Sequence, residues 1–271
     1  EIRKEYAALT PDQLKVIDPC SGSGHILAYM FDVLMQIYES YGYTTREAVA
    51  SIVENNLYGL DIDDRAAQLA YFAVMMKARQ YDRRFFSRDI QPHVYAIAES
   101  NHVDSFALEY FCNGDAKLKK AMDTIISELY DAKEYGSILT VTPQDWSALY
   151  ARFAEIKEDI HISRETTLRG LLPLVQVAEA LAQKYDVVVT NPPYAGAKGF
   201  NEKLKHYIEH QYPNEKTDLY AVFVSKSCQL SKYICSIVTP ITWMYNPTFK
   251  DFRKILVNSI DIASLLEFGS D

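Results

Sequence analysis

The sequence predicts an α/β domain built on a doubly wound, mostly parallel sheet. Short apolar runs alternate along the chain with longer segments whose apolar residues recur at helical spacing. Such alternation is typical of right-handed βαβ units. The run 185–190 is apolar almost without interruption, as expected for a strand that helices cover on both faces.

Composition restricts the class of protein further. The 271 residues carry a net charge of −8 and are 48% hydrophobic, which fits one large globular domain or two small ones. The acidic balance argues mildly against a free-standing DNA-binding protein. We expect a cytoplasmic protein with no membrane partner, because no leader-like or bilayer-spanning run is present and the four scattered cysteines form no CxxC pair.

Three strands are predicted in the first hundred residues, and the first two end in a carboxylate. Helices are assigned where apolar residues recur every three or four positions, and Thr45 is the expected N-cap of one of them. The predicted elements are, in order, a strand at 16–18, a turn at 19–24, a helix at 26–38, a helix at 45–55, a strand at 57–61, a helix at 65–79 and a strand at 94–98.

The pattern changes between residues 100 and 184, which are polar, charge-mixed and helical in period. We expect a helical insertion there, ending in one long amphipathic helix that starts near Leu168. The elements predicted after it are a strand at 185–190, a helix at 219–230, a strand at 234–238, a helix at 249–256 and a strand at 262–268.

A glycine-containing turn follows the first strand, in the order Asp18, Pro19, Cys20, Ser21, Gly22, Ser23, Gly24. Glycines after a strand let the backbone approach a ligand and leave helix N–H groups free, which indicates a nucleotide-like ligand. Leu27 replaces the third glycine of the dinucleotide fingerprint and a carboxylate would repel a pyrophosphate, so a dehydrogenase is excluded. The carboxylate suits a cationic ligand, such as the amino group and sulfonium of S-adenosylmethionine. A tight turn without a ligand would have the same sequence.

The second predicted strand ends at Asp61. A carboxylate in this place can accept hydrogen bonds from both ribose hydroxyls of a nucleotide. We expect Asp63 to cap the helix that follows. A helix cap without any ligand would also account for either aspartate.

Asn191-Pro192-Pro193-Tyr194 follows the strand at 185–190. The exocyclic amine of adenine is a poor nucleophile, because its lone pair is delocalised into the ring. The Asn191 side-chain oxygen and the Pro192 carbonyl could accept both amine hydrogens and draw the nitrogen toward tetrahedral geometry. The prolines stiffen this backbone, and Tyr194 offers a face on which an extruded base could stack. The alternative is a proline turn that merely ends a strand.

These residues resemble the motifs of amino-methyltransferases that modify DNA. Segments 18–27, 59–63 and 191–194 are similar to motifs I, II and IV, with Cys20-Ser21 in place of the usual Ala-Cys pair. Segments 218–223 and 237–244 are similar to motif V and to the strand and turn after it. The resemblance is closest to large single-chain enzymes of the type IIG restriction and BREX/Pgl phage-exclusion kind.

The resemblance implies a Rossmann-like, class I S-adenosylmethionine-dependent methyltransferase domain. It would span 1–271 and carry the helical insertion, at about 100–184, between strands three and four. The implied reaction is site-specific methylation of N6 of a flipped adenine in double-stranded DNA, in a restriction-modification or phage-defence system. The family's N-terminal helical region and C-terminal target-recognition domain are not visible in this sequence.

The resemblance also assigns roles to single residues, without any metal ligand. The methionine part of the cofactor would be held by Asp18, Pro19, Gly22 and Gly24. Its ribose and adenine would be held by Asp61 and Ile62, with Glu99 as the partner of the adenine amine unless Glu99 is an ordinary strand-end acid. The target base would be held by Asn191, Pro192, Pro193 and Tyr194.

Two other functions stay open at this point. Glutamine methyltransferases of translation release factors share the Asn-Pro-Pro-Tyr tetrapeptide and also act on a planar amide nitrogen. Their first motif is usually of the Asp-x-Gly-x-Gly type, and they lack a long helical insertion. A non-catalytic DNA-associated module with the same fold would suit the acidic balance of the chain.

Overall fold

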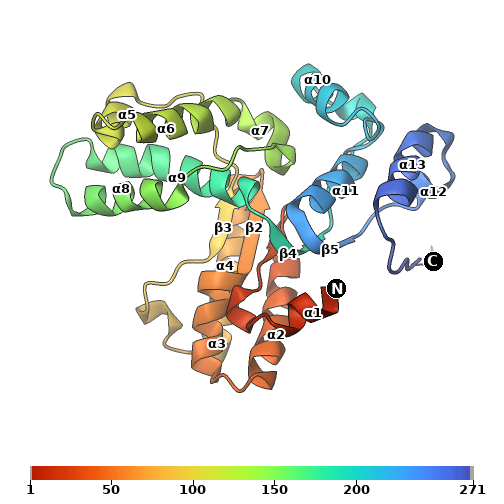
Figure 1. Cartoon of the computed structure of the whole chain (residues 1–271), viewed down its shortest axis with the longest axis horizontal. Coiled ribbons are helices and arrows are strands. Elements are labelled where there is room, and N and C mark those ends of the chain that lie inside the picture. The colour runs from red at the N-terminus through yellow and green to blue at the C-terminus, as the bar shows by residue number, and fades with distance from the viewer. Residues whose placement is uncertain (1, 269–271) are drawn as a thin grey trace.

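A computed structural model describes residues 2–268 and contains a five-stranded parallel sheet (Figure 1). Its strand order is β3-β2-β1-β4-β5, and every neighbouring pair runs parallel. The strands are β1 (Val16–Asp18), β2 (Leu57–Asp61), β3 (His93–Ala96), β4 (Tyr185–Thr190) and β5 (Ser231–Ile237). The predicted doubly wound α/β fold is therefore confirmed. The strand order reverses between β1 and β4, and this reversal is where such sheets bind ligands.

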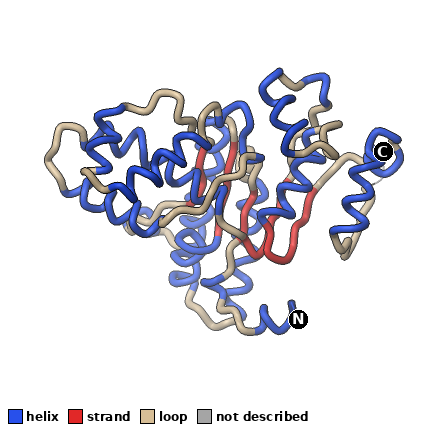
Figure 2. The backbone as a smooth tube through the Cα atoms, turned by 45° about the horizontal axis from the view of Figure 1, so that its top comes forward, coloured by secondary structure: helices blue, strands red, loops and turns tan. Residues whose placement is uncertain are grey.

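Alternate residues of the strands bury into two different cores. Val16 and Leu57 pack in a cluster with helices on one face, whereas Ile17 and Tyr58 pack in a cluster on the other. The first face is covered by α2 (His25–Ser40), α3 (Thr45–Ser51) and α4 (Asp64–Tyr81). The second is covered by α9 (Arg164–Ala182), while α11 (Leu219–Leu230) packs beside β4 and β5. Figure 2 shows the strands lying between these layers of helices.

Helices fill the interval between β3 and β4. They are α5 (Ser105–Cys112), α6 (Ala116–Glu128), α7 (Ala132–Tyr135), α8 (Trp146–Glu158) and α9. Figure 1 shows α5, α6 and α8 as a group to one side of the sheet. The remaining helices are α1 (Ile2–Ala7), α10 (Glu202–Gln211), α12 (Thr242–Tyr245) and α13 (Lys250–Ser259). Within residues 2–268 no helix combines the length and the hydropathy that crossing a bilayer requires.

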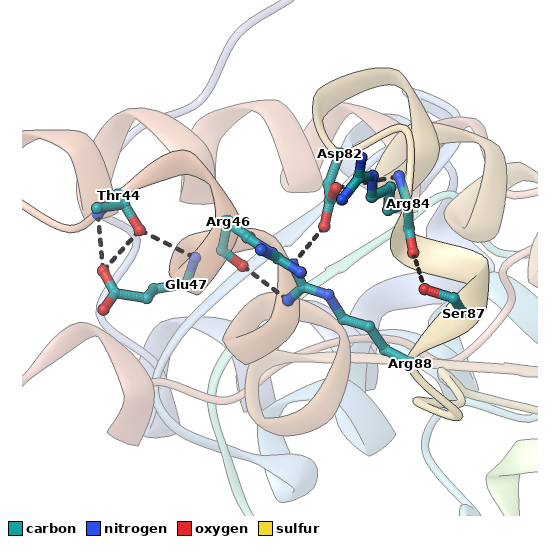
Figure 3. Close-up of polar contacts among 7 residues, drawn as sticks. All are labelled: Thr44, Arg46, Glu47, Asp82, Arg84, Ser87 and Arg88. Atoms are coloured by element: carbon teal, nitrogen blue, oxygen red, sulfur yellow. Dashed lines mark hydrogen bonds and ion pairs between the residues drawn. The ribbon is translucent and has the colours of Figure 1, made fainter.

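The predicted N-cap of α3 is wrong by one residue, because Thr44 and not Thr45 caps the helix. The Thr44 hydroxyl oxygen accepts from the Glu47 N–H at 3.3 Å, and the Glu47 carboxylate accepts from the Thr44 N–H at 3.0 Å (Figure 3). This reciprocal box needs a glutamate three residues after the cap. Thr45 has Ala48 at that distance, so it cannot form the box.

The loop between α4 and β3 is fastened to α3 at the amino edge of the sheet. The Arg88 side chain forms an ion pair with Asp82 at the end of α4 and donates to the Arg46 carbonyl at 3.1 Å (Figure 3). The Ser87 hydroxyl donates to the Arg84 carbonyl at 2.8 Å. These contacts join the end of α4 and the loop after it to the first turn of α3.

The strand predicted at 262–268 is also wrong. This segment has no regular secondary structure and pairs with none of the described strands. Its apolar side chains Ile262, Leu265 and Phe268 are exposed. An apolar run forms a strand only where a neighbouring strand supplies the ladder of hydrogen bonds, and the sequence pattern does not report that neighbour.

Candidate active site

The segments that follow β1, β2 and β4 meet at the carboxyl edge of the sheet. Asp18 at the end of β1 lies in register with Gly59 of β2, and Ile17 lies in register with Val188 of β4. Hydrogen bonds join the three segments directly. The Ser21 N–H donates to the Leu60 carbonyl at 2.9 Å, and the Thr190 hydroxyl donates to Asp18 at 2.7 Å. The strand order thus brings together residues that lie up to 172 positions apart.

Asp18 is fully buried at the centre of this edge. Its Oδ1 atom accepts from the Cys20 N–H at 3.0 Å and from the Thr190 hydroxyl. Its Oδ2 atom is buried and has no hydrogen-bond partner in the part of the chain that the structure describes. Burial raises the pKa of this carboxyl from 3.8 to about 7, against the two hydrogen bonds that lower it, and the nearby Asp61 raises it further. A buried orphan oxygen of this kind needs a donor or a cation.

The turn after Asp18 is open to a ligand at one of its two glycines. Gly22 has a φ of +53°, and a Cβ atom added there would meet nothing within 4 Å. Gly24 has a φ of +87°, and its Cβ atom would lie 2.8 Å from the Ala70 Cα atom of α4. Close packing of α2 on α4 thus explains Gly24, whereas open space borders Gly22. The Ser21 hydroxyl oxygen is a second buried polar atom without a partner among the described residues.

Asp61 ties the glycine turn to the second strand. Its Oδ2 atom accepts from the Gly22 N–H at 2.8 Å, and its Oδ1 atom accepts from the Asp63 N–H at 2.9 Å. Each carboxylate oxygen keeps a further lone pair for a ligand hydroxyl. Asp63 caps α4 as predicted, because its Oδ1 atom accepts from the N–H groups of Arg65 and Ala66.

The other two residues predicted near the cofactor lie at different places on this edge. Ile62 follows Asp61 directly, and 46% of its surface is exposed, so it offers an apolar contact beside the carboxylate. Glu99 lies three residues beyond the end of β3 and is exposed. Among the described residues no hydrogen bond joins Glu99 to the segments around Asp18 and Asp61.

The tetrapeptide after β4 presents its polar groups outward. Asn191, Pro193 and Tyr194 are exposed, whereas Pro192 is buried. The Tyr194 hydroxyl donates to the Asn191 Oδ1 atom at 2.6 Å, and 51% of the Tyr194 surface is exposed. The Tyr194 hydroxyl is protonated at neutral pH at its ordinary pKa of 10, and partial burial raises that pKa further. The Asn191 oxygen keeps one free lone pair, and the tyrosine ring keeps a face on which a planar base can stack.

Asp218 fixes the loop that follows the tetrapeptide. Its Oδ1 atom accepts from the Ala195 N–H at 3.1 Å and from the Tyr220 N–H at 3.2 Å. It therefore caps α11 and holds the loop with the same atom. The Leu219 N–H donates back to the Ala195 carbonyl at 2.9 Å. The sequence marked 218–223 as a motif but gave Asp218 no role, although an aspartate before an apolar helix signals an N-cap.

Three further residues, which no sequence pattern singled out, contact these motifs or lie next to residues that do. Thr190 binds Asp18, Ser137 donates to the Pro19 carbonyl, and Lys226 is buried nearby on α11. Thr190 could have been found, because a hydroxyl at the end of a strand lies level with the neighbouring strand end. Ser137 and Lys226 carry no local signal. Within residues 2–268 no group of three or more histidine, cysteine or acidic side chains is placed to hold a metal ion.

Comparison with known proteins places this geometry in context. Residues 55–271 match the model of the Eco57I restriction-modification methylase family. The chain is 34% identical to the adenine-specific methyltransferase BrxX of Escherichia coli O9:H4 (strain HS), over 100% of the chain and 25% of the relative. It is 36% identical to the adenine-specific methyltransferase PglX of Lacticaseibacillus casei (strain Zhang), over 99% of the chain and 23% of the relative. The chain thus spans about a quarter of the length of these two relatives.

A third similarity is local. Over 65 residues, or 22% of the chain, it is 40% identical to a putative type II restriction enzyme and methyltransferase, RM.MjaORFECS2P, of Methanocaldococcus jannaschii. This stretch covers 6% of that protein.

Proposed function

Because this chain belongs to the Eco57I restriction-modification methylase family, we propose that it is the catalytic domain of a DNA adenine-N6 methyltransferase that uses S-adenosylmethionine. One observation carries the proposal. A buried orphan carboxylate oxygen of Asp18, the carboxylate of Asp61 and the exposed amide oxygen of Asn191 all lie at one carboxyl edge of the sheet. The names of the relatives BrxX and PglX support the same chemistry.

The residues at this edge fit the charge and shape of S-adenosylmethionine. This cofactor supplies an electrophilic methyl group on a positively charged sulfur. The buried Asp18 carboxylate lacks a counter-charge among the described residues, and a cationic amino group would supply one and restore its ionised form. Gly22 leaves room beside the turn, Asp61 can accept ribose hydroxyls, and Ile62 offers an apolar contact to the cofactor's adenine. Pro19 and Gly24 would hold the methionine part together with Asp18 and Gly22, and Glu99 would bind the cofactor's adenine amine.

The tetrapeptide would activate the target amine by hydrogen bonding. The free lone pair of the Asn191 oxygen and the Pro192 carbonyl accept the two amine hydrogens, which localises the nitrogen lone pair for attack on the methyl group. Pro193 stiffens the backbone that holds these acceptors. Tyr194 stacks on the extruded base with its exposed ring and orients the Asn191 side chain through its hydroxyl.

We further propose that the domain works inside a longer protein that serves restriction-modification or phage defence. In that protein, residues 1–271 would form the catalytic domain, with helices α5–α9 as an insertion, and double-stranded DNA would be gripped by a target-recognition domain outside these residues. An N-terminal helical region would complete the architecture. The length of the relatives, about four times that of this chain, supports this arrangement. The net charge of −8 also fits a domain that obtains its phosphate contacts elsewhere.

The direct test is transfer of tritium from labelled S-adenosylmethionine to adenine in plasmid DNA by the full-length protein. Nucleoside chromatography should find the label in N6-methyl-2′-deoxyadenosine. The Asn191→Ala variant should lose at least about a hundredfold in rate, as enzymes do when a transition-state hydrogen-bonding partner is removed. Asn246→Ala is the matched control, because Asn246 is also exposed and also precedes a proline, but its side chain accepts from Thr248 and forms no hydrogen bond with the tetrapeptide among the described residues.

Three outcomes would contradict the proposal. Label in a translation release factor and not in DNA would indicate a glutamine methyltransferase. No label in any substrate would indicate a non-catalytic module. Full activity of Asn191→Ala would refute the role of the tetrapeptide.

A further inference from the structure

A short segment of the helical region, residues 136–139, lies buried next to the proposed site. It follows α7 and precedes α8, and all four of its residues are buried. Connections between helices usually run over the surface, because buried backbone groups need partners. Here the partners come from segments that are distant in sequence and belong to the proposed site.

The first contacts join residues 136–139 to the cofactor side of the site. The Ser137 hydroxyl, 4% exposed as a residue, donates to the buried carbonyl of Pro19 at 2.5 Å, across 118 positions of sequence. Gly136 has a φ of +63°, and a Cβ atom there would lie 3.3 Å from the Cδ1 atom of Ile62. The segment therefore supports the turn after β1 and backs the residue that follows Asp61.

The second contacts join the same residues to the target-base side. Lys226 on α11 is 2% exposed, and its Nζ atom donates to the Leu139 carbonyl at 2.5 Å. The Tyr212 hydroxyl donates to the Ile138 carbonyl at 2.9 Å. Because Asp218 at the start of α11 fixes the loop after the tetrapeptide, α11 contacts both residues 136–139 and that loop.

The Lys226 ammonium group binds mainly the Leu139 carbonyl. Among the described residues no carboxylate forms an ion pair with Lys226, so a backbone carbonyl is its main partner. Burial lowers the pKa of its ammonium group to about 8, with a smaller contribution from Lys184. Burying a lysine without a counter-ion is costly, and here its ammonium group donates to residues 139 and 140 and joins them to α11.

We propose that residues 136–139 form a positioning element for methyl transfer, in which Ser137 fixes the cofactor-binding turn and Lys226 couples that turn to the target-base loop. This inference rests on the proposed function and gives the helical region a part in it. Ser137 is a positioning residue, because it acts on Pro19 and not on cofactor or substrate. The alternative is that the hydrogen bonds of Ser137 and Lys226 stabilise the fold and have no effect on the site.

A pair of matched serines separates the two readings. Ser100 is also 4% exposed and donates to the Ile126 carbonyl of α6 at 2.6 Å, and among the described residues it forms no hydrogen bond with the turn at 19–24. Ser137→Ala and Ser100→Ala each leave a carbonyl without its side-chain donor, so each should lower Tm. Only Ser137→Ala should weaken S-adenosylmethionine binding, by about tenfold in Kd. The Pro19 carbonyl would lose its donor and move the cofactor-binding turn, at a cost of about one hydrogen bond. Ser137→Cys, which is larger than serine but keeps a weak donor, should fall between wild type and Ser137→Ala.

The experiment combines calorimetry of S-adenosylmethionine binding with hydrogen exchange of the unliganded chain. Exchange at the amides of residues 20–24 should accelerate in Ser137→Ala and stay unchanged in Ser100→Ala. Equal Kd values for Ser137→Ala and wild type, or an equal loss in both alanine variants, would overturn the inference. A wild-type chain that binds no S-adenosylmethionine would contradict the proposed function. Hydrogen exchange needs no cofactor, so unchanged exchange at residues 20–24 in Ser137→Ala would by itself refute the positioning role of Ser137.

Discussion

Replacing Asp18 with asparagine should stabilise the unliganded chain at alkaline pH while it weakens the proposed cofactor site. Asp18 is fully buried, and one of its oxygens has no partner among the described residues. The difference between the ordinary pKa of 3.8 and the pKa of about 7 corresponds to about 4 kcal/mol against the ionised form above pH 7. The amide of asparagine would leave its own N–H groups unpaired, which offsets about 1–3 kcal/mol of this gain.

The sign of the pH dependence follows from the raised pKa. Between about pH 4 and pH 7 the folded state holds the Asp18 proton and the unfolded state has released it. The free energy of unfolding therefore falls as pH rises through this window, and the penalty is fully present above pH 7. An asparagine side chain cannot ionise, so the free energy of unfolding of the Asp18→Asn variant should not show this decrease between pH 4 and about pH 7. At pH 8.5 the variant should therefore be more stable than wild type by about 1–3 kcal/mol.

Urea unfolding at pH 5.5 and pH 8.5 measures the effect. Asp186→Asn is the control, because Asp186 is also buried on a strand but accepts the Lys15 N–H at 2.7 Å and pairs with Lys232 at 3.1 Å. This control should lose stability at both pH values, since it gives up a compensated charge. The reasoning is refuted if Asp18→Asn is less stable than wild type at pH 8.5, or if both proteins lose the same stability between the two pH values.

Further substitutions test the turn and the stacking residue. Gly24→Ala should lower the free energy of unfolding by roughly 3 kcal/mol, because the added Cβ atom would meet the Ala70 backbone and the φ of Gly24 is positive. Gly22→Ala should lower it by only about 1 kcal/mol, because Gly22 has a positive φ but open space beside it. Equal losses of stability in urea unfolding would contradict the packing assigned to Gly24. Tyr194→Ala should raise the KM for DNA by about tenfold or more, because the stacking surface is lost. Tyr194→Phe keeps the ring and should change the KM for DNA by less than about threefold. Steady-state methylation kinetics measure both values, and equal KM values for the two variants would argue against stacking.

The sequence predicts most of the fold because the signals for it are local. The bounds of β1, β2 and β4 follow from short apolar runs that end in polar residues, and α2 follows from helical spacing. The strand predicted at 262–268 fails for the converse reason, because a strand depends on a neighbour that the run itself does not encode. The N-cap prediction at Thr45 fails because it ignores the spacing to Glu47, which only Thr44 satisfies.

The candidate site could be predicted only in part. Asp18 and Asp61 end their strands and Asn191 directly follows one, and parallel strands bring such residues to one edge without further information. Ser137 meets Pro19 through the path of the helical region, and no spacing in the sequence records that contact. The sequence assigns Gly24 to the cofactor, and the structure adds a packing contact with Ala70, which lies 46 positions later in the chain and which no local pattern predicts.

The central claim is that the carboxyl edge around Asp61 binds S-adenosylmethionine, and calorimetry on the chain with a matched pair of variants tests it most directly. Asp61→Ala and Asp63→Ala each remove a carboxylate that accepts backbone N–H groups, and the second also removes the N-cap of α4, at about 1 kcal/mol of stability. We expect wild-type binding in the micromolar range, retained in Asp63→Ala and weakened by at least about tenfold in Asp61→Ala, as for the loss of a charge-assisted hydrogen bond. Binding that is absent in the wild type, or equal in all three proteins, would contradict the claim.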